Sequence, residues 1–223
     1  MFTETNLWPW ACLFKQIPLR WIKLCLERGA HLKILEDRIL TDGYVLGKDI
    51  LKVDRFLNHQ VDVGLLNEVG KAFYERFKDM GINKILTIEA SGIAIAAITA
   101  QYFDNVPVVF AKKFDSVNAD PDSYETNVYS FTKKRNYSVR VSKKFIHPGD
   151  RVLILDDFLA QGRAAAGLIE LVKQGGGEVF GVGIVIEKSF QEGNAYVSSL
   201  GVEVHSLAKI KAFIDEKPVF EEV

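Results

Sequence analysis

The sequence predicts an α/β fold in which a central parallel sheet is flanked by helices on both faces. Segments with strand and helix patterns alternate from residue 62 to residue 207, with short connections, as is typical of parallel sheets. The run Val152–Leu155 is continuously apolar and rich in branched residues, which favours a central strand covered on both faces. A chain of 223 residues with 48% hydrophobic and 26% charged residues can bury such a core.

The first predicted element of this fold is a helix over 62–80. Its apolar residues recur at helical spacing, Asp62 is a suitable N-cap, and Gly81 a suitable stop. The elements that follow are a strand at 84–88, a tight loop at 89–92, a helix at 93–103 and a strand at 107–111.

The second half continues the alternation after an irregular stretch. Residues 112–127 contain few aliphatic side chains and are predicted to form an exposed loop. The remaining elements are a hairpin of strands 129–132 and 137–141 around 133–136, a strand from 151, a helix at 164–174 ended by Gly175–Gly177, a strand at 179–186 and a final strand at 202–207.

The overall composition excludes several classes of function. A net charge of −1 gives no basis for a nucleic-acid or membrane surface, and no apolar stretch reaches the ~20 residues of a membrane span. Two cysteines cannot form a disulfide framework, which favours the cytoplasm. The four histidines are scattered without the spacing of metal ligands, so no metal site made by protein ligands alone is expected.

Residues 1–31 differ in composition from the rest of the chain. All three tryptophans and both cysteines lie within the first 25 residues. We expect an atypical N-terminal extension outside the functional fold and outside the natural protein, because Glu27–Gly29 can be encoded by a purine-rich ribosome-binding run and Leu32 by TTG, an alternative start codon. The rival interpretation is a genuine amphipathic extension that covers a partner surface.

The clearest candidate site follows the apolar strand. Asp156 and Asp157 come directly after it, and Gly162 precedes a helix expected to begin at about Arg163. Ligands bind at the carboxyl ends of strands in open α/β sheets, and the free amides of a helix N-terminus hold phosphate. This arrangement predicts a sugar-phosphate site, with carboxylates for ribose hydroxyls and amides for phosphate. The alternative is a solvated turn in which an aspartate caps the helix.

Two further segments suggest a polyphosphate site. The loop residues Ala90, Ser91 and Gly92 enter a helix and can present backbone amides to an anion, although Ser-Gly is also a common turn. Lys112 and Lys113 follow the strand that ends at residue 111, where two cations would neutralise a leaving pyrophosphate. The alternative is a solvated lysine pair.

A further lysine ends the strand at 179–186. Glu187 and Lys188 follow the apolar residues directly. An ammonium group at the carboxyl end of a strand can donate to an exocyclic oxygen of a base. Taken alone, a lysine in this position is more often an ordinary surface lysine.

Six segments together resemble one known family. The strand–Asp-Asp–loop–Gly–helix pattern resembles the 5-phosphoribosyl 1-pyrophosphate (PRPP) motif of type I phosphoribosyltransferases. The full set is similar to bacterial xanthine phosphoribosyltransferases, over about residues 32–223. These segments are Ile50–Gln60, Thr87–Ile93, Val108–Lys113, Val128–Lys133, Leu155–Ala160 and Ile184–Gln191.

The resemblance implies a type I phosphoribosyltransferase fold with a small hood built from about residues 32–61 and the C-terminal part. It implies transfer of phosphoribose from PRPP to N9 of xanthine, by a cytoplasmic, Mg²⁺-dependent homodimer, with the metal carried by PRPP. The implied xanthine-binding residues are Leu51, Asn58 and Lys188, although Asn58 also suits a helix or turn cap. The implied PRPP loop consists of Ala160, Gln161, Gly162, Arg163 and Ala164.

The PRPP loop departs from the patterns of related enzymes. Type I enzymes commonly carry Thr-Gly-x-Thr at Gln161–Ala164, so hydroxyl ligands to the 5′-phosphate are missing and backbone amides must replace them. Hypoxanthine–guanine enzymes carry an acid at Ala160, so no general base is identified. The xanthine branch is expected to read Ala-Asn-Gly-Gln-Ala, from which Gln161 and Arg163 depart. Arg163 either adds a cation to the phosphate site or faces solvent.

Two alternative functions remain open from the sequence. Guanine or hypoxanthine could be the preferred base of the same reaction. A non-catalytic purine regulator could use the same domain to sense PRPP and bind DNA, although residues 1–60 show neither a clear helix-turn-helix nor a marked basic surplus.

Overall fold

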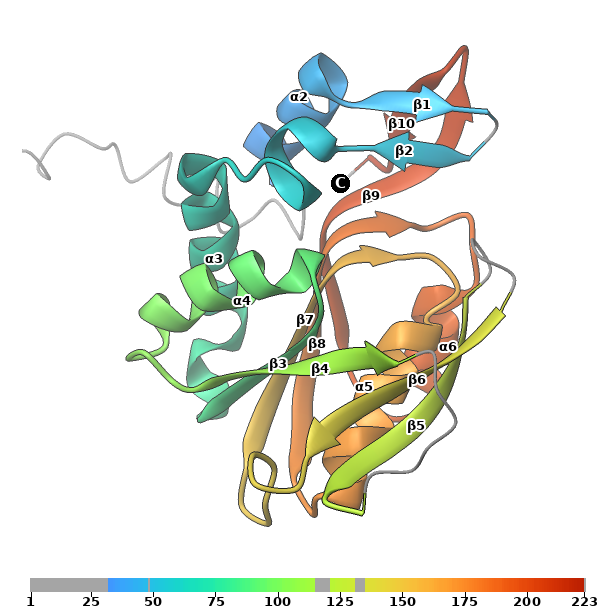
Figure 1. Ribbon diagram of the computed structural model, residues 1–223. Helices are drawn as coiled ribbons and strands as arrows, with labels where there is room; N and C mark the ends of the chain where they lie inside the picture. The colour runs from blue at the N-terminus through green and yellow to red at the C-terminus, as the bar shows by residue number, and fades with distance from the viewer. Residues whose placement is uncertain (1–31, 48, 115–120, 131–134, 223) are drawn as a thin grey trace, which may run out of the picture. The chain divides into compact units, whose positions relative to one another are not determined.

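The computed structural model describes residues 32–47, 49–114, 121–130 and 135–222, and within them eight strands form one sheet in the order β10-β9-β8-β7-β3-β4-β6-β5 (Figure 1). The five central strands, from β9 to β4, are parallel, and both edges of the sheet are antiparallel. The strands are β3 (Lys84–Ile88), β4 (Val108–Phe114), β5 (Ser123–Ser130), β6 (Arg135–Ser142), β7 (Arg151–Leu159), β8 (Glu178–Lys188), β9 (Val204–Ile214) and β10 (Lys217–Phe220).

Helices cover both faces of this sheet, as predicted. The helices α3 (Val63–Phe77) and α4 (Ser91–Tyr102) pack on one face, and α5 (Arg163–Gln174) and α6 (Gly193–Ser199) on the other. Successive side chains of β7 therefore enter two different cores: Leu153 packs in the core that contains Phe73 and Ile95, and Ile154 in the core that contains Leu168. Burial on both faces explains why this strand is apolar throughout.

The helix ends predicted around α3 are confirmed. The Asp62 side chain accepts a hydrogen bond from the Leu65 amide at 3.0 Å, which caps the helix. A short 3-10 turn, Lys78–Met80, then leads to Gly81, whose φ of 62° is the left-handed conformation that favours glycine. The predicted strand at 84–88 is also confirmed, as β3.

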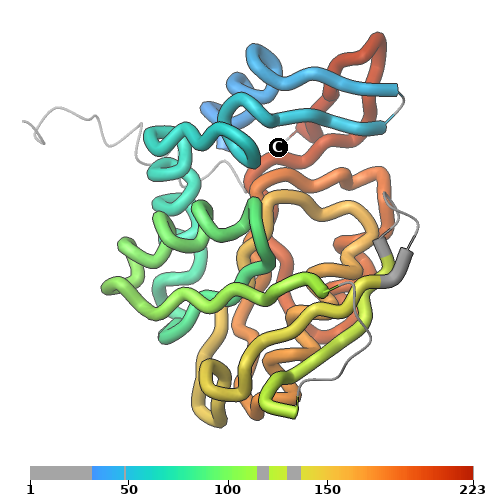
Figure 2. The backbone as a smooth tube through the Cα atoms, viewed as in Figure 1, coloured from blue at the N-terminus to red at the C-terminus, as the bar shows by residue number. Residues whose placement is uncertain are grey.

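A small layer, called the hood here, contains both early and late parts of the chain. It consists of α2 (Lys33–Asp42), β1 (Tyr44–Leu46), β2 (Ile50–Lys52) and a π-helical turn (Asp54–Asn58), beside β10 and the end of β9 (Figure 2). The Leu32 amide donates to the Leu207 carbonyl at 2.7 Å, which joins the two parts.

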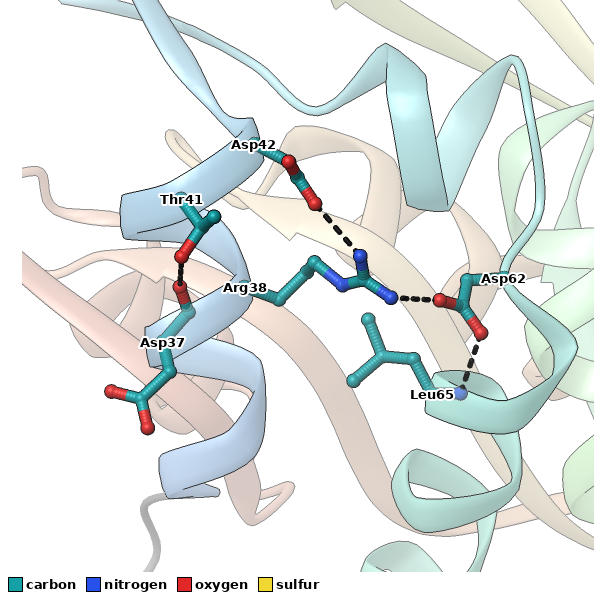
Figure 3. Close-up of polar contacts among 6 residues, drawn as sticks. All are labelled: Asp37, Arg38, Thr41, Asp42, Asp62 and Leu65. Carbon is teal, nitrogen blue, oxygen red and sulfur yellow. Dashed lines mark hydrogen bonds and ion pairs between the residues drawn. The ribbon is translucent and has the colours of Figure 1, made fainter.

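One arginine ties the hood to the helical layer below it (Figure 3). Arg38 on α2 donates to Asp42 at 2.7 Å and also forms an ion pair with Asp62, the N-cap of α3. The Asp62 carboxylate thus serves both α3 and α2. This contact fixes the start of α3 relative to α2.

Several predicted boundaries are wrong. The stretch 112–127 is not a loop at its ends, because β4 continues through Phe114 and β5 begins at Ser123, while residues 115–120 lie outside the described part. These polar strands are stabilised by antiparallel pairing with β6, which the side-chain pattern does not reveal. The predicted hairpin is confirmed, although residues 131–134 are not described.

The predicted final strand at 202–207 is also wrong in its limits. β9 runs from Val204 to Ile214, and β10 follows it. α6 and the elements of the hood were not predicted. Within the described residues, no helix combines the length and apolar character that crossing a membrane requires.

Candidate active site

The candidate site lies between β3 and β7, two neighbouring strands whose connections to the next strand run in opposite directions along the sheet. From β3 the chain proceeds through α4 to β4, on one side, whereas from β7 it proceeds through α5 to β8, on the other. Loops that leave two neighbouring strands in opposite directions open a crevice at the carboxyl edge, the usual ligand site of such sheets. Both predicted anion loops, 89–92 and 160–164, leave this edge.

The two aspartates lie at this point, inside β7 rather than after it. β7 extends through Leu159 because it continues to pair with β8, so the prediction that the strand ends before the acids is wrong. Asp156 is 5% exposed and Asp157 half-buried, and the Asp157 amide donates to Asp156 Oδ1 at 3.0 Å. Burial, followed by the charge of Asp157, raises the pKa of Asp156 well above its ordinary value.

The predicted phosphate loop turns sharply into α5. Gly162 has a φ of 73°, and α5 begins at Arg163, so the amides of the first helical turn lack helical partners. Such a turn is suited to phosphate. The loop also packs against α6, since the Gly193 amide donates to the Ala160 carbonyl at 3.0 Å.

Arg163 does not join the carboxylates. Its guanidinium lies 4.4 Å from the centre of the Tyr196 ring, and the side chain is exposed. It lines a separate cavity of about 540 Å³ between β5, α5 and α6. The structure therefore places this cation beside α6.

The loop at 89–92 is joined to the second lysine of the predicted pair, at the end of β4. The Glu89–Ala90 peptide bond is cis, and Glu89 Oε1 accepts a hydrogen bond from the Lys113 amide at 2.8 Å. A Cβ atom on Gly92 would lie 1.8 Å from Thr87 Oγ1, so no other residue fits there without movement. The close approach of Gly92 to Thr87 places the start of α4 against the end of β3.

Only one lysine of the pair is associated with the aspartates. The charge of Lys113 lowers the pKa of Asp156, against the larger effect of burial. The Lys113 ammonium lies 5.6 Å from the centre of the Tyr137 ring. The pKa of Tyr137 is raised by burial and by the charge of Asp156. Lys112 is the neighbour of Lys113 on β4, and side chains alternate along a strand, so Lys112 faces the other side.

The three implied base-binding residues lie between the hood and the sheet edge. Asn58 Nδ2 donates to Asp157 Oδ2 at 3.4 Å, which brings a hood residue to the carboxylates. Lys188, at the end of β8, donates to the Asp49 carbonyl at 2.6 Å, and burial lowers its pKa while the Asp49 carboxylate opposes this shift. Leu51 is 6% exposed and packs into the core below the hood.

A cavity of about 490 Å³ separates the hood from the loop at 89–92. Sequence reasoning identified three of its lining residues and missed the others, although the missed ones belong to the recognised segment Ile50–Gln60. On the hood side, the lining of the cavity includes both a basic residue, Lys52, and an acidic residue, Asp54. Its lining residues are Lys52, Asp54, Asn58, His59, Ala90 and Ser91.

The comparisons with known proteins agree with this arrangement. The phosphoribosyl transferase domain family matches residues 61–208. The structure superimposes on adenine phosphoribosyltransferase from Rhodothermus marinus with a TM-score of 0.66, over 80% of this chain and all of that one, at 24% sequence identity. The Saccharomyces cerevisiae adenine enzyme gives a TM-score of 0.62 at 21% identity, over 78% and 99% of the two chains. These likenesses show the fold, and with the domain match the chain belongs to the phosphoribosyltransferase family.

Closer relatives define the branch. Xanthine phosphoribosyltransferase 2 of Clostridium botulinum is 57% identical over 190 residues, which are 85% of this chain and all of the relative. The xanthine phosphoribosyltransferase of Clostridioides difficile is 60% identical over 181 residues, 81% of this chain and 95% of that protein. The Laribacter hongkongensis enzyme of the same name is 55% identical over 85% of this chain and all of its own. The branch is therefore that of the bacterial xanthine phosphoribosyltransferases.

Proposed function

We propose that this enzyme transfers phosphoribose from PRPP to N9 of xanthine, which yields xanthosine monophosphate and pyrophosphate in purine salvage. The observation that carries the proposal is the Asn58–Asp157 hydrogen bond, because it brings a base-recognition residue against the ribose carboxylates. The names and high identity of the relatives support xanthine as the base.

PRPP would lie along the carboxyl edge of the sheet. Its 5′-phosphate binds the amides of residues 160–164 at the start of α5, and its ribose hydroxyls donate to Asp156 and Asp157. The pyrophosphate faces Lys113 and the amides of residues 90–92. Lys112 faces the other side of β4, so we assign the contact with pyrophosphate to Lys113 alone.

The chemistry follows from charge separation. As the bond to pyrophosphate breaks, the ribose acquires oxocarbenium character, and the carboxylates of Asp156 and Asp157, when ionised, stabilise that positive charge. Lys113 and the loop amides stabilise the leaving anion. Holding both reactants in one crevice converts a bimolecular step into an effectively unimolecular one. Ala160 carries no proton acceptor, and we assign no general base.

Xanthine recognition follows from hydrogen-bonding groups. Xanthine presents oxygen acceptors where adenine presents an amine donor, so the Lys188 ammonium favours the oxopurine. Asn58 offers a donor and an acceptor to the base. Leu51 is 6% exposed and packs in the core, so its contribution to the base site is to support the hood from behind.

The donor set suits Mg²⁺ bound mainly through PRPP. Mg²⁺ prefers oxygen ligands and is commonly held by one or two carboxylates together with substrate phosphates. Asp156, Asp157 and Glu89 supply carboxylate oxygens at this edge, and the described residues contain no group of three His, Cys, Asp or Glu placed to hold a metal alone. When bound, the metal supplies positive charge for the pyrophosphate.

We further propose that residues 32–223 form the functional unit, with its hood, and that it acts as a homodimer in the cytoplasm without nucleic-acid or membrane partners. Light scattering with size-exclusion chromatography tests the dimer, and a monomer mass at assay concentrations would contradict it.

One assay tests the proposed function. Purified protein is incubated with PRPP, Mg²⁺ and equal concentrations of xanthine, guanine, hypoxanthine or adenine, and nucleotide formation is followed. We expect the highest kcat/KM for xanthine. A higher kcat/KM for guanine or hypoxanthine would show that this base is the preferred substrate. Specific DNA binding without turnover would support a regulator instead.

A further inference from the structure

The phosphate loop is supported from behind by a short segment that none of the proposed catalytic roles involves. We call this segment, Gln191–Asn194, the buttress. Its Gly193 amide donates to the Ala160 carbonyl at 3.0 Å, and its Gln191 side chain accepts a hydrogen bond from Gln161 Nε2 at 3.2 Å. Both contacts join the loop to the chain that leads into α6.

The contact between the buttress and the loop leaves no room for side chains. A Cβ atom on Gly193 would lie 2.3 Å from the Ala160 carbonyl oxygen, and one on Gly162 would lie 2.8 Å from the Gly193 carbonyl oxygen. Real Cβ atoms do not approach so closely, so the two backbones touch through glycine on both sides. The position of the loop therefore depends on the position of α6.

The position of α6 is in turn fixed by a buried carboxylate. Glu187 is 3% exposed, and it accepts two hydrogen bonds from Asn194 Nδ2, at 3.0 Å to Oε1 and 3.1 Å to Oε2. The hydroxyl of Ser206 on β9, itself fully buried, donates to the same carboxylate at 2.5 Å. Burying a carboxylate is costly unless such donors compensate for its lost hydration.

Glu187 also lies next to Lys188 in β8, but the two side chains point to opposite faces of the strand. Lys188 reaches the hood, whereas Glu187 reaches α6. One strand end thus contributes to both halves of the substrate site: directly on the base side, and through Asn194 and Gly193 on the phosphate side.

We infer that Glu187 and Asn194 are positioning residues for the 5′-phosphate of PRPP: they hold α6, and through the Gly193–Ala160 contact they hold the phosphate loop in its binding geometry. The inference rests on the proposed function, because it assigns the 5′-phosphate to residues 160–164. Neither residue touches the reacting atoms.

Exchanging the two functional groups tests the inference. Glu187→Gln places an amide N–H against the Asn194 amide or loses one acceptor, and Asn194→Asp places a second carboxylate against Glu187. Each single variant should raise the KM for PRPP by about tenfold, the size expected when a buried charged hydrogen bond is lost. The double variant restores a donor–acceptor pair with the roles reversed, and it should return to within about threefold of wild type.

Two readouts separate positioning from general loss of structure. The KM for xanthine should change by less than about twofold in all three variants, and calorimetric binding of ribose 5-phosphate should weaken in parallel with the KM for PRPP. Asn67→Asp on α3 is the matched control, because it makes the same chemical change at a half-buried asparagine that hydrogen-bonds to the Val63 carbonyl and to Tyr102, away from the phosphate loop. It should leave both KM values unchanged.

The outcomes are distinct. Equal increases in both KM values, or a double variant worse than either single variant, would overturn the inference. If the core variants do not fold, Gln191→Ala removes only the contact with Gln161. It should raise the KM for PRPP about threefold, and an unchanged value would equally overturn the inference. Absence of phosphoribosyl transfer by the wild-type protein would instead contradict the proposed function, while ribose 5-phosphate binding still reports on the buttress.

Discussion

At the scale of single residues, the site combines groups whose charges depend on how deeply they are buried. Asp156 is held among apolar strands beside a second carboxylate, and both effects raise its pKa. A carboxyl group with a raised folded-state pKa contributes stability below its ordinary value, and this contribution is lost as the pH rises through the folded-state value. At pH values above its raised pKa, the charged form of Asp156 therefore weakens the fold.

Replacing this carboxylate separates stability from activity. Asp156→Asn should lower kcat/KM for PRPP by about a hundredfold, as is typical when one preorganised charge is removed. Its Tm should equal or exceed that of wild type at neutral pH, and this advantage should shrink as the pH falls through the raised pKa of Asp156 toward its ordinary value. Thermal denaturation at several pH values checks both. A parallel loss of Tm and activity would indicate that Asp156 and Asp157 have only a structural role in the turn.

A second residue-scale prediction concerns base selection. Lys188→Ala should reduce discrimination between xanthine and adenine by ~1–3 kcal/mol, because the purine oxygen loses its donor. Competition assays with both bases measure the ratio of kcat/KM, and Lys71→Ala, an exposed lysine on α3, serves as the control. Unchanged substrate ranking would exclude Lys188 from base recognition.

At the scale of elements, strands and loops differ in how far the sequence reveals them. β3, α3 and the core of β7 were predictable because burial on one or both faces leaves a regular apolar pattern. The end of β4 and the first part of β5, both within 112–127, were missed because their polar side chains hide backbone pairing with β6. The hood was implied by the family resemblance, but its helices and strands were not predicted, because these short elements are stabilised by a distant part of the chain.

The loop between β3 and α4 allows an element-scale prediction. Gly92→Ala should reduce kcat for PRPP by about tenfold or more, because its Cβ would overlap Thr87 Oγ1 and displace the loop. Adding Thr87→Ala removes that hydroxyl and should restore part of the activity. Thr87→Ala alone should be nearly neutral in stability, since the hydroxyl has no hydrogen-bond partner in the described structure. Steady-state kinetics and thermal melts check all three, and an active Gly92→Ala would contradict the tight fit.

The candidate site was predictable in its parts rather than in its assembly. Asp156, Asp157, Asn58 and Lys188 were identified from the sequence, and the structure places Asn58 against Asp157. Lys52, Asp54 and His59 were not singled out, because only the closure of the hood over residues 90–91 brings them to the cavity. Arg163 was left open between two roles, and its contact with Tyr196 depends on α6, which no pattern revealed.

At the scale of the whole molecule, the residues of the proposed site lie between Leu51 and Lys188, and relatives match this chain along their full length over 190 residues. We therefore expect a chain of residues 32–223 to retain the kcat, KM values and Tm of the full chain. Kinetics and melting of the two forms side by side check this. A loss of activity on removal of residues 1–31 would show that they belong to the working enzyme.

The hood combines the earliest and the latest described parts of the chain, and this affects the order in which the molecule folds during its synthesis. Synthesis proceeds from the N-terminus at about 5–20 residues per second, and domains begin to fold as they emerge. The strands and loops of the proposed ribose-phosphate site emerge before β9 and β10, while α2 and β1, made first, must wait for these late strands. We therefore expect nascent chains to become protected from protease around β7 and α5 earlier than around α2, which ribosome-bound chains stalled at successive lengths would reveal. The last strands to be translated then complete the hood that covers the cavity above residues 90–91.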